Sequence, residues 1–407
     1  MSDNLARHFL IGEDVVFLNH GSFGACPRPV FEAYQNWQLE LERQPVAFLG
    51  RDLTERMRDA REAMAAELHT SADHVVGLTN ATLGLNIVAQ SLALKPGDQI
   101  LTTDHEYSAL EKTWTYVARR TGAEIVVVPV PVPLVSEARF TETILAGFTD
   151  RTRVLFLSHI TSPTALVFPI EKALAAARGR GIYTVIDGAH TPGHIRLDLD
   201  ALGADFYAGN CHKWLMAPKG SAFLHVRPEL QGLINPLVIS HGWTAESKTP
   251  GAIGAFGNSP FIDELEMQGT RDPAAWLAVP AALAFRRDND WDEVAAHCRA
   301  LAQGTAARLA ERTGLAPLGS PELCAPQMVA MPIPDCDPAE LQRGLIDRYG
   351  IEIPVFKWQH HTIVRLSVQG YNSKPQMDLL IEALTTLLGL RAGGADRAAA
   401  AGARHHG

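Results

Sequence analysis

Residues 183–190 read YTVIDGAH, and residues 205–214, a little further along the chain, read DFYAGNCHKW. In both stretches a short apolar and β-branched run gives way to reactive side chains, Asp187 in the first and Lys213 in the second. Ligands of open α/β sheets gather beyond the carboxyl ends of the strands. The two stretches therefore predict a sheet that carries a carboxylate and an amine at one edge.

Similar apolar runs surround these two stretches and indicate the rest of the sheet. They cover residues 75–78, 99–102, 124–130, 153–158 and 221–226. Helix-forming stretches separate them, for example from Thr82 onward, over 107–120, and after Pro169, which suits a helix start. Near-continuous apolar strands alternating with helices predict an α/β domain whose mostly parallel sheet is covered on both faces.

The pattern changes after about residue 269. Residues 274–313 have helical spacing, followed by a strand over 327–333, a helix from Pro338, a strand over 361–368 and a helix near 375–390. This predicts a smaller α+β C-terminal domain. We expect an N-terminal segment (1–30) that packs with the small domain, a large domain (31–270), the small domain (271–391) and a disordered tail (392–407).

Composition excludes several classes of protein. The 407 residues include 36 Lys+Arg and 45 Asp+Glu, a formal charge of −9, which argues against nucleic acid as a partner. No run approaches the roughly 18–20 apolar residues of a membrane span. The five cysteines form no CxxC pair and fit neither a disulfide framework nor a zinc site. We expect a soluble cytoplasmic protein with no metal site and no membrane partner.

The two strand-end residues suggest a specific chemistry. A partly buried lysine has a lowered pKa, and its neutral amine can form a Schiff base with an aldehyde cofactor. Asp187 is suited to pair with a protonated pyridine nitrogen, as in pyridoxal phosphate. The alternatives are a surface lysine that begins a loop and an aspartate that caps a turn.

Two further stretches contain candidate anion sites. In residues 78–84 (LTNATLG), the N–H groups of Ala81 and Thr82 are predicted to face a phosphate at a helix start, although simple N-capping explains the same residues. In residues 364–372 (VRLSVQGYN), Arg365 is a candidate to clamp a substrate carboxylate. A surface ion pair is the alternative for Arg365.

Taken together, these motifs resemble the class-V aminotransferase and cysteine desulfurase superfamily of pyridoxal-phosphate enzymes, and within it the isopenicillin N epimerases. The resemblance covers nearly the whole chain and rests on residues 17–32 (FLNHGSFGACPRPVFE), 104–114, 158–193, 205–226, 256–260, 268–283 and 364–372. It implies the pyridoxal-phosphate-dependent transferase fold (fold type I), pyridoxal 5′-phosphate as cofactor and a homodimer with shared active sites.

The resemblance also implies residue roles. Lys213 would bind the cofactor and move the Cα proton, Asp187 would hold the ring nitrogen, His190 would face the phenolic oxygen, and Tyr107 would cover the opposite ring face. The phosphate would be held by Ala81, Thr82, Asn210, His212 and, from the neighbouring subunit, Thr270. Arg365 would bind the substrate carboxylate, and Asn19, His20 and Ser22 would close over the substrate.

This chain departs from the family pattern in one decisive place. Cysteine desulfurases carry a reactive cysteine shortly before the carboxylate-binding arginine, and residues 349–361 contain none. Without a thiolate nucleophile no persulfide forms there. We therefore expect an isopenicillin-N-epimerase-like isomerase, which needs a second acid besides Lys213: Tyr107, His20 or His241. A β-eliminating C–S lyase, a class-V aminotransferase and, least favoured, a non-catalytic dimer are the alternatives.

Overall fold

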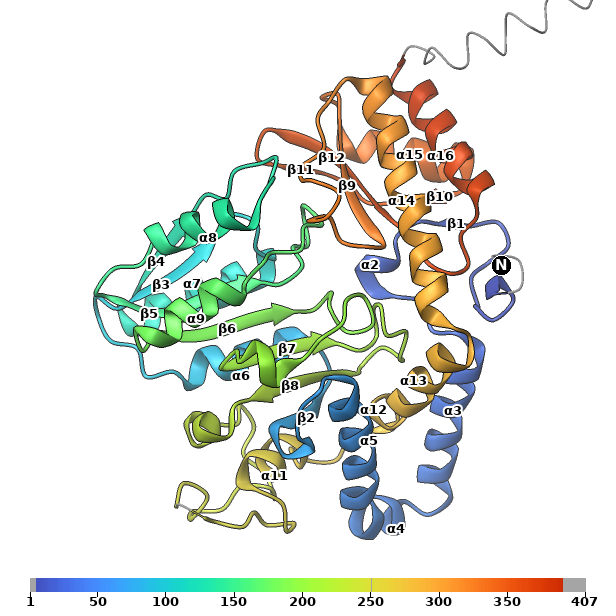
Figure 1. Ribbon diagram of the computed structural model, residues 1–407. Helices are drawn as coiled ribbons and strands as arrows, with labels where there is room; N and C mark the ends of the chain where they lie inside the picture. The colour runs from blue at the N-terminus through green and yellow to red at the C-terminus, as the bar shows by residue number, and fades with distance from the viewer. Residues whose placement is uncertain (1–4, 250, 391–407) are drawn as a thin grey trace, which may run out of the picture.

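A seven-stranded sheet forms the centre of the computed structural model, which describes residues 5–249 and 251–390 (Figure 1). Its strand order is β2-β8-β7-β6-β5-β3-β4. The parallel pairs run from β4 to β7, and β8 alone runs against its two neighbours. The strands are β2 (Val75–Leu78), β3 (Gln99–Thr103), β4 (Glu124–Val128), β5 (Thr152–Ser158), β6 (Tyr183–Gly188), β7 (Phe206–Asn210) and β8 (Ala222–Val226).

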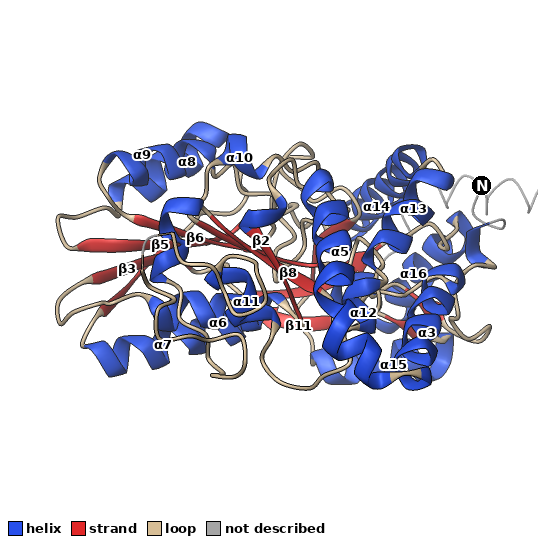
Figure 2. Cartoon of the chain, turned by 90° about the horizontal axis from the view of Figure 1, so that it is seen from below, coloured by secondary structure: helices blue, strands red, loops and turns tan. Residues whose placement is uncertain are grey.

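Helices cover both faces of this sheet, which explains why its central strands are apolar on both sides (Figure 2). One layer contains α6 (Ala81–Ser91), α7 (Ser108–Thr121) and α11 (Pro260–Glu266). The other contains α8 (Glu137–Ala146), α9 (Glu171–Gly179) and α10 (Leu199–Leu202). The predicted fold class, a mostly parallel α/β sheet between helical layers, is confirmed.

A second, smaller sheet lies in the C-terminal part of the chain. Its order is β11-β12-β9, all antiparallel, formed by β9 (Met328–Ile333), β11 (Val355–Trp358) and β12 (His361–Ser367). The helices packed beside it are α14 (Trp291–Thr313), α15 (Pro338–Tyr349) and α16 (Lys374–Leu387) (Figure 1). A strand of the N-terminal segment, β1 (Val16–Phe17), pairs with β10 (Ile351–Glu352) in this region.

The remaining helices lie between the two sheets and along one side (Figure 1). They are α2 (His20–Phe23), α3 (Arg28–Arg43), α4 (Pro45–Ala47), α5 (Leu53–Glu67), α12 (Ala274–Leu277) and α13 (Val279–Asp288). Both α12 and α13 pack against α3 and α5. The domain limits proposed from the sequence remain predictions, and the predicted tail over 392–407 lies outside the described residues.

Over residues 5–249 and 251–390, no helix has the combination of length and apolar character that crossing a membrane would require.

Candidate active site

Three neighbouring strands end at one cavity. Ser158 at the end of β5 is in register with Asp187 of β6, and Gly188 is in register with Gly209 of β7. The cavity is lined by Ser22, Phe23, Asn80, Ala81, Thr82, Tyr107, Ser158, Ile160, Ser162, Asp187, Ala189, His190, Asn210, His212 and Lys213. The structure thus brings most of the predicted site residues together at the carboxyl edge of the sheet.

Lys213 lies in the loop that follows β7, where its amine is held away from solvent. Burial and, to a smaller extent, the charge of Arg365 lower the pKa of Lys213 to about 7, with Asp187 opposing the shift. Its Nζ atom is 3.1 Å from Nε2 of His190. A large fraction of this amine is therefore neutral near pH 7, which is the nucleophilic form.

The proton on His190 is positioned by Trp214. The indole Nε1, which can only donate, donates to Nδ1 of His190 over 3.3 Å. Because burial lowers the pKa of His190 well below its usual value, the ring is neutral and carries its proton on Nε2. That proton is directed at the Lys213 amine. His194 stacks on Trp214 with ring centroids 4.0 Å apart and supports the indole from behind.

Asp187 presents a buried carboxylate to the same cavity. One oxygen accepts the N–H of Ala189 at 2.8 Å, and in the described part of the chain no hydrogen bond reaches the other oxygen. Burial raises the pKa of Asp187. A cationic partner in the cavity would favour its ionised form. The carboxylate is therefore suited to pair with a protonated ring nitrogen.

The N-terminus of α6 faces the cavity, but one of its donors is already used. Asn80 caps the helix by accepting the Leu83 N–H at 2.8 Å. The Ala81 N–H donates to Oδ1 of Asn210 at 2.8 Å, a partner that local sequence does not reveal. His212 lies 3.3 Å from the Ser221 carbonyl through Nδ1, so its Nε2 remains available on the cavity side.

Arg365, on β12, packs against the cavity wall. It donates to the carbonyl and hydroxyl oxygens of Ser162 at 2.7 and 3.0 Å, and to the Ser22 hydroxyl at 3.1 Å. Its Nε atom is buried without a partner, and among the ion pairs of the described residues none involves Arg365. Burial lowers its pKa to about 10, so it stays cationic at pH 7. The predicted surface ion pair is thus absent from the described residues, and the guanidinium lacks an anion.

The N-terminal segment braces the lysine loop. Nε2 of His20 lies 3.0 Å from the Lys213 carbonyl, and Nδ1 lies 3.0 Å from the Tyr371 hydroxyl. His20 is fully buried behind Lys213 and is absent from the cavity lining. Gly24 has φ +71°, and a Cβ there would lie 1.9 Å from the His212 carbonyl oxygen, so only glycine allows this close approach.

The other predicted residues lie in different positions. Tyr107 lines the cavity and is 44% exposed. Asn19 does not line the cavity itself. Its side-chain oxygen accepts a hydrogen bond of 2.5 Å from the hydroxyl of Ser22, which does line the cavity. Thr270 and His241 line a second cavity, between α5 and the segment that follows α11, and this cavity is separate from the Lys213 cavity in the single chain.

Sequence reasoning missed part of the cavity wall. Ser158, the last residue of β5, lines it together with Ile160 and Ser162 of the following loop, and Phe23 lines its mouth with 69% of its surface exposed. Behind Ser158, the buried Glu106 accepts its N–H at 2.8 Å and its hydroxyl at 2.6 Å. Ser158 follows an apolar run just as Asp187 does, so the strand-end rule could have identified it.

None of the five cysteines lines the cavity, and all are free. Cys211 is the one nearest in sequence to Lys213, and burial strongly raises the pKa of its thiol. A buried thiol with a raised pKa is a poor nucleophile. The cavity therefore lacks the thiolate that persulfide formation requires.

Comparison with known proteins identifies the family of this chain. The family model for aminotransferase class-V matches residues 22–380. Isopenicillin N epimerase of Streptomyces clavuligerus is 37% identical over 386 residues, covering 93% of this chain and 96% of the relative. The probable chloroplastic L-cysteine desulfhydrase of Arabidopsis thaliana is 28% identical, covering 92% and 83% of the two chains.

Among solved structures, the cysteine desulfurase CsdA of Escherichia coli superposes with a TM-score of 0.79 at 24% identity, covering 96% of this chain and 98% of that one. At that identity the likeness concerns the fold alone. The family model spans nearly nine-tenths of the chain, and the alignment with the epimerase spans more than nine-tenths. These two matches therefore show family membership as well as the fold. The chain belongs to the class-V aminotransferase family of pyridoxal-phosphate enzymes.

Proposed function

We propose that this protein is a pyridoxal-phosphate-dependent epimerase that inverts the Cα stereocentre of an amino-acid substrate, with isopenicillin N as the first candidate. The observation that carries the proposal is the composition of one cavity. The cavity is lined by the Lys213 amine and by no cysteine, and the Arg365 guanidinium lies directly behind its wall, bonded to the lining residues Ser162 and Ser22. An amino acid needs an anion site for its carboxylate and a base near Cα, and both are available here.

The residues present fit the cofactor. The buried Asp187 carboxylate has an unused oxygen, and the Thr82 N–H at the start of α6 has no hydrogen bond to a described residue. We assign Asp187 to the ring nitrogen, His190 to the phenolic oxygen, and Thr82, His212, Ala81 and Asn210 to the phosphate region. Bound pyridoxal 5′-phosphate withdraws electrons from Cα and makes its proton acidic.

The chain's own groups then move the proton. Lys213, whose pKa of about 7 suits both acceptance and donation near neutral pH, is assigned to one face of Cα. Arg365, held by Ser22 and Ser162, orients the substrate through its carboxylate. The exposed ring of Phe23 at the mouth offers an apolar surface to the substrate side chain.

Inversion also requires a group on the opposite face of Cα. Of the three candidates, Tyr107 alone lines the Lys213 cavity. His20 is buried, and both of its ring nitrogens are engaged. His241 lies in the second cavity with Thr270 and would act only from a neighbouring subunit. Tyr107 is therefore the candidate that the position of the side chains favours within one chain.

A neighbouring subunit is supported by the loop that precedes α11, which protrudes at the lower edge of the molecule (Figure 1). Large apolar side chains are exposed along it: Leu237, Val238, Ile239, Trp243, Ile253 and Phe256. Exposed apolar surface of this kind is typical of protein–protein contacts. We propose a homodimer in which this region meets the partner, so that the nearby Thr270 can contribute to the partner's phosphate site.

The main alternative is β-elimination of a cysteine-like substrate, as the name of the Arabidopsis relative suggests. Elimination also begins with loss of the Cα proton, and it needs no catalytic cysteine. The free state of all five cysteines supports a reducing compartment, and we keep the cytoplasm as the proposed location.

Deuterium incorporation distinguishes these reactions. We expect the holoenzyme in deuterated water to convert isopenicillin N into its Cα epimer with deuterium at Cα, because the proton returns from a solvent-exchanged group. Mass spectrometry and chiral chromatography measure both. Release of pyruvate, ammonia and hydrogen sulfide from L-cysteine without epimer formation would instead establish the lyase, and accumulation of the pyridoxamine form would establish the aminotransferase.

The lowered pKa of Lys213 predicts how cofactor attachment depends on pH. With a pKa of about 7, the neutral fraction of the amine rises roughly tenfold between pH 6 and pH 8 and then levels off. We expect the rate of covalent attachment of pyridoxal phosphate to the apoenzyme to follow this curve in stopped-flow absorbance. A rate that continues to rise tenfold per pH unit up to pH 10 would mean that the lysine has an ordinary pKa.

A further inference from the structure

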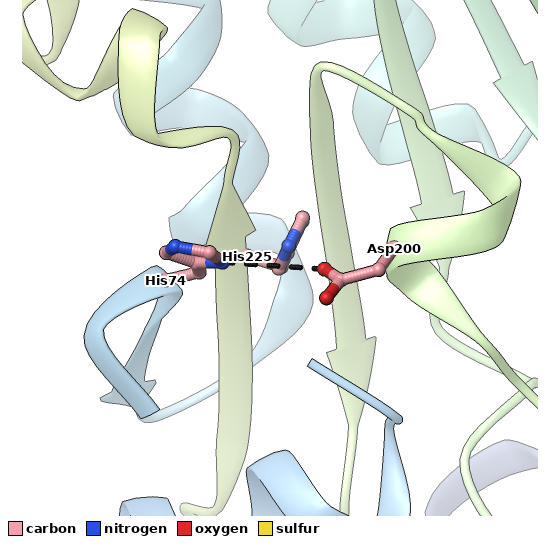
Figure 3. Close-up of side chains that lie close together, drawn as sticks. All are labelled: His74, Asp200 and His225. Carbon is pink, nitrogen blue, oxygen red and sulfur yellow. Dashed lines mark ion pairs between the residues drawn. The ribbon is translucent and has the colours of Figure 1, made fainter. Parts of the chain in front are cut away.

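A second group of chemically active side chains lies at the opposite end of β8 from the cavity. His74, Asp200 and His225 place one nitrogen or oxygen each within 4.8 Å of one another (Figure 3). Ala222, at the start of β8, pairs with Asn210 beside the cavity, and His225 is three residues further along the strand. At the rise of a β-strand this is a separation of about 10 Å, so the group is distinct from the active site.

Three separate segments bring these side chains together. His74 ends a 3₁₀ turn (Ala72–His74) just before β2, Asp200 lies in α10, and His225 lies in β8. The backbone of His225 is in register with Val75 of β2 and with Tyr207 of β7. The buried histidine is thus fixed by the central sheet, whereas His74 is partly exposed and the Asp200 side chain is 59% exposed.

The Thr70 hydroxyl lies close to all three of these side chains. Its oxygen lies 2.6 Å from Oδ1 of Asp200 and 3.3 Å from both Nδ1 of His74 and Nε2 of His225. The carboxylate takes the only hydroxyl proton at a short distance. Both imidazole contacts are longer than the usual hydrogen bond of about 2.7–3.0 Å. The Thr70 hydroxyl is thus tightly bonded to Asp200 alone, and it would have to rotate away or become a ligand when an ion binds here.

We propose that His74, Asp200 and His225 bind a Zn²⁺ ion, with the Thr70 hydroxyl or a water molecule completing the coordination. Two imidazoles and one carboxylate are ordinary zinc ligands, at about 2.0–2.2 Å from the metal. Donors around a tetrahedral ion at these bond lengths lie about 3.3–3.6 Å apart, whereas Nδ1 of His74 and Oδ1 of Asp200 are 4.0 Å apart and the group as a whole lies within 4.8 Å, so the side chains must move inward to bind the ion. The exposed Asp200 and the partly exposed His74 can make the remaining small adjustment.

The ion would act as a structural link. It would join the segment that follows α5, the short helix α10 and strand β8, which are otherwise connected here by the Thr70 hydroxyl and by the Leu199 N–H bond to the Leu68 carbonyl at 3.0 Å. A metal that binds the folded chain more tightly than the unfolded chain raises its stability by mass action. The proposed zinc site differs from the expectation in the sequence analysis that the protein has no metal site.

Zinc titration of the full-length holoenzyme tests the proposal. Isothermal titration calorimetry at neutral pH should give one Zn²⁺ per chain, and Zn²⁺ should raise the unfolding temperature. In His74→Gln and Asp200→Asn we expect this binding to weaken by at least about 100-fold, since even loss of an outer-shell partner costs 10–100-fold. Turnover should be unchanged in both variants, which shows that they remain folded.

His297→Gln is the matched control, because His297 is exposed on α14 and belongs to no such group. It should bind Zn²⁺ as the unaltered chain does. The histidine pairs at 360–361 and 405–406 are present in every variant, so any zinc they bind contributes equally to all titrations. Equal affinity and stoichiometry in all forms, or no zinc binding at all, would overturn the proposal.

Discussion

Lys213→Ala should reduce turnover by at least about 10⁴-fold, the upper range for loss of a general acid–base group. The variant should also lose the absorption of lysine-bound cofactor. The reason is that Lys213 is the amine in the cavity lining, with a pKa of about 7, next to Asp187 and His190. Steady-state kinetics and an absorption spectrum of the purified variant measure both effects.

Lys219→Ala provides the matched control for this experiment. Lys219 is six residues further along the same loop, and it donates to the Gly24 carbonyl at 2.9 Å but does not line the cavity. We expect Lys219→Ala to keep the lysine-bound cofactor and most of the activity. Activity retained in Lys213→Ala, or lost equally in the two variants, would contradict the assignment of Lys213.

Arg365→Lys should weaken substrate binding by about 1–3 kcal/mol, or roughly 5–150-fold in KM, because an ammonium cannot reproduce a two-pronged contact with a carboxylate. The buried guanidinium has no carboxylate partner among the described residues, and its Nε lacks any hydrogen bond. The effect should appear mainly in KM, since Arg365 is assigned to binding and orientation.

The decarboxylated amine of the same substrate separates this role from a purely structural one. An amine without the α-carboxylate should bind Arg365→Lys and the unaltered enzyme with similar affinity. The affinity is measured from the change in the absorption spectrum of the bound cofactor as the amine is added. If both ligands lose affinity equally, Arg365 supports the fold of the cavity and does not bind the carboxylate. An unchanged KM for the amino acid would also contradict the assignment.

The features of the sheet that could be predicted are those that local sequence determines. The apolar runs at residues 153–158 and 183–187 became β5 and β6, and the rule about strand ends placed Asp187 and Lys213 at one cavity. The direction of β8 could not be read, because the apolar run at 221–226 looks the same in a parallel or an antiparallel strand. The structure shows it antiparallel to both neighbours.

The parts of the site that escaped prediction depend on contacts between distant residues. His20 was expected to close over the substrate, but it uses its ring nitrogens on Tyr371 and on the Lys213 carbonyl, 351 and 193 residues away along the chain. The Ala81 N–H was expected to be free for a phosphate, and it contacts Asn210, 129 residues away. Such pairings follow from tertiary packing, which spacing along the sequence does not encode.

The most direct test is to find the residue to which pyridoxal 5′-phosphate is attached. The purified holoenzyme is reduced with borohydride, digested and analysed by mass spectrometry. We predict a pyridoxyl group on the peptide that contains Lys213, and on no other lysine. A label on a different residue, or no label in a protein incubated with the cofactor, would contradict the account of this active site.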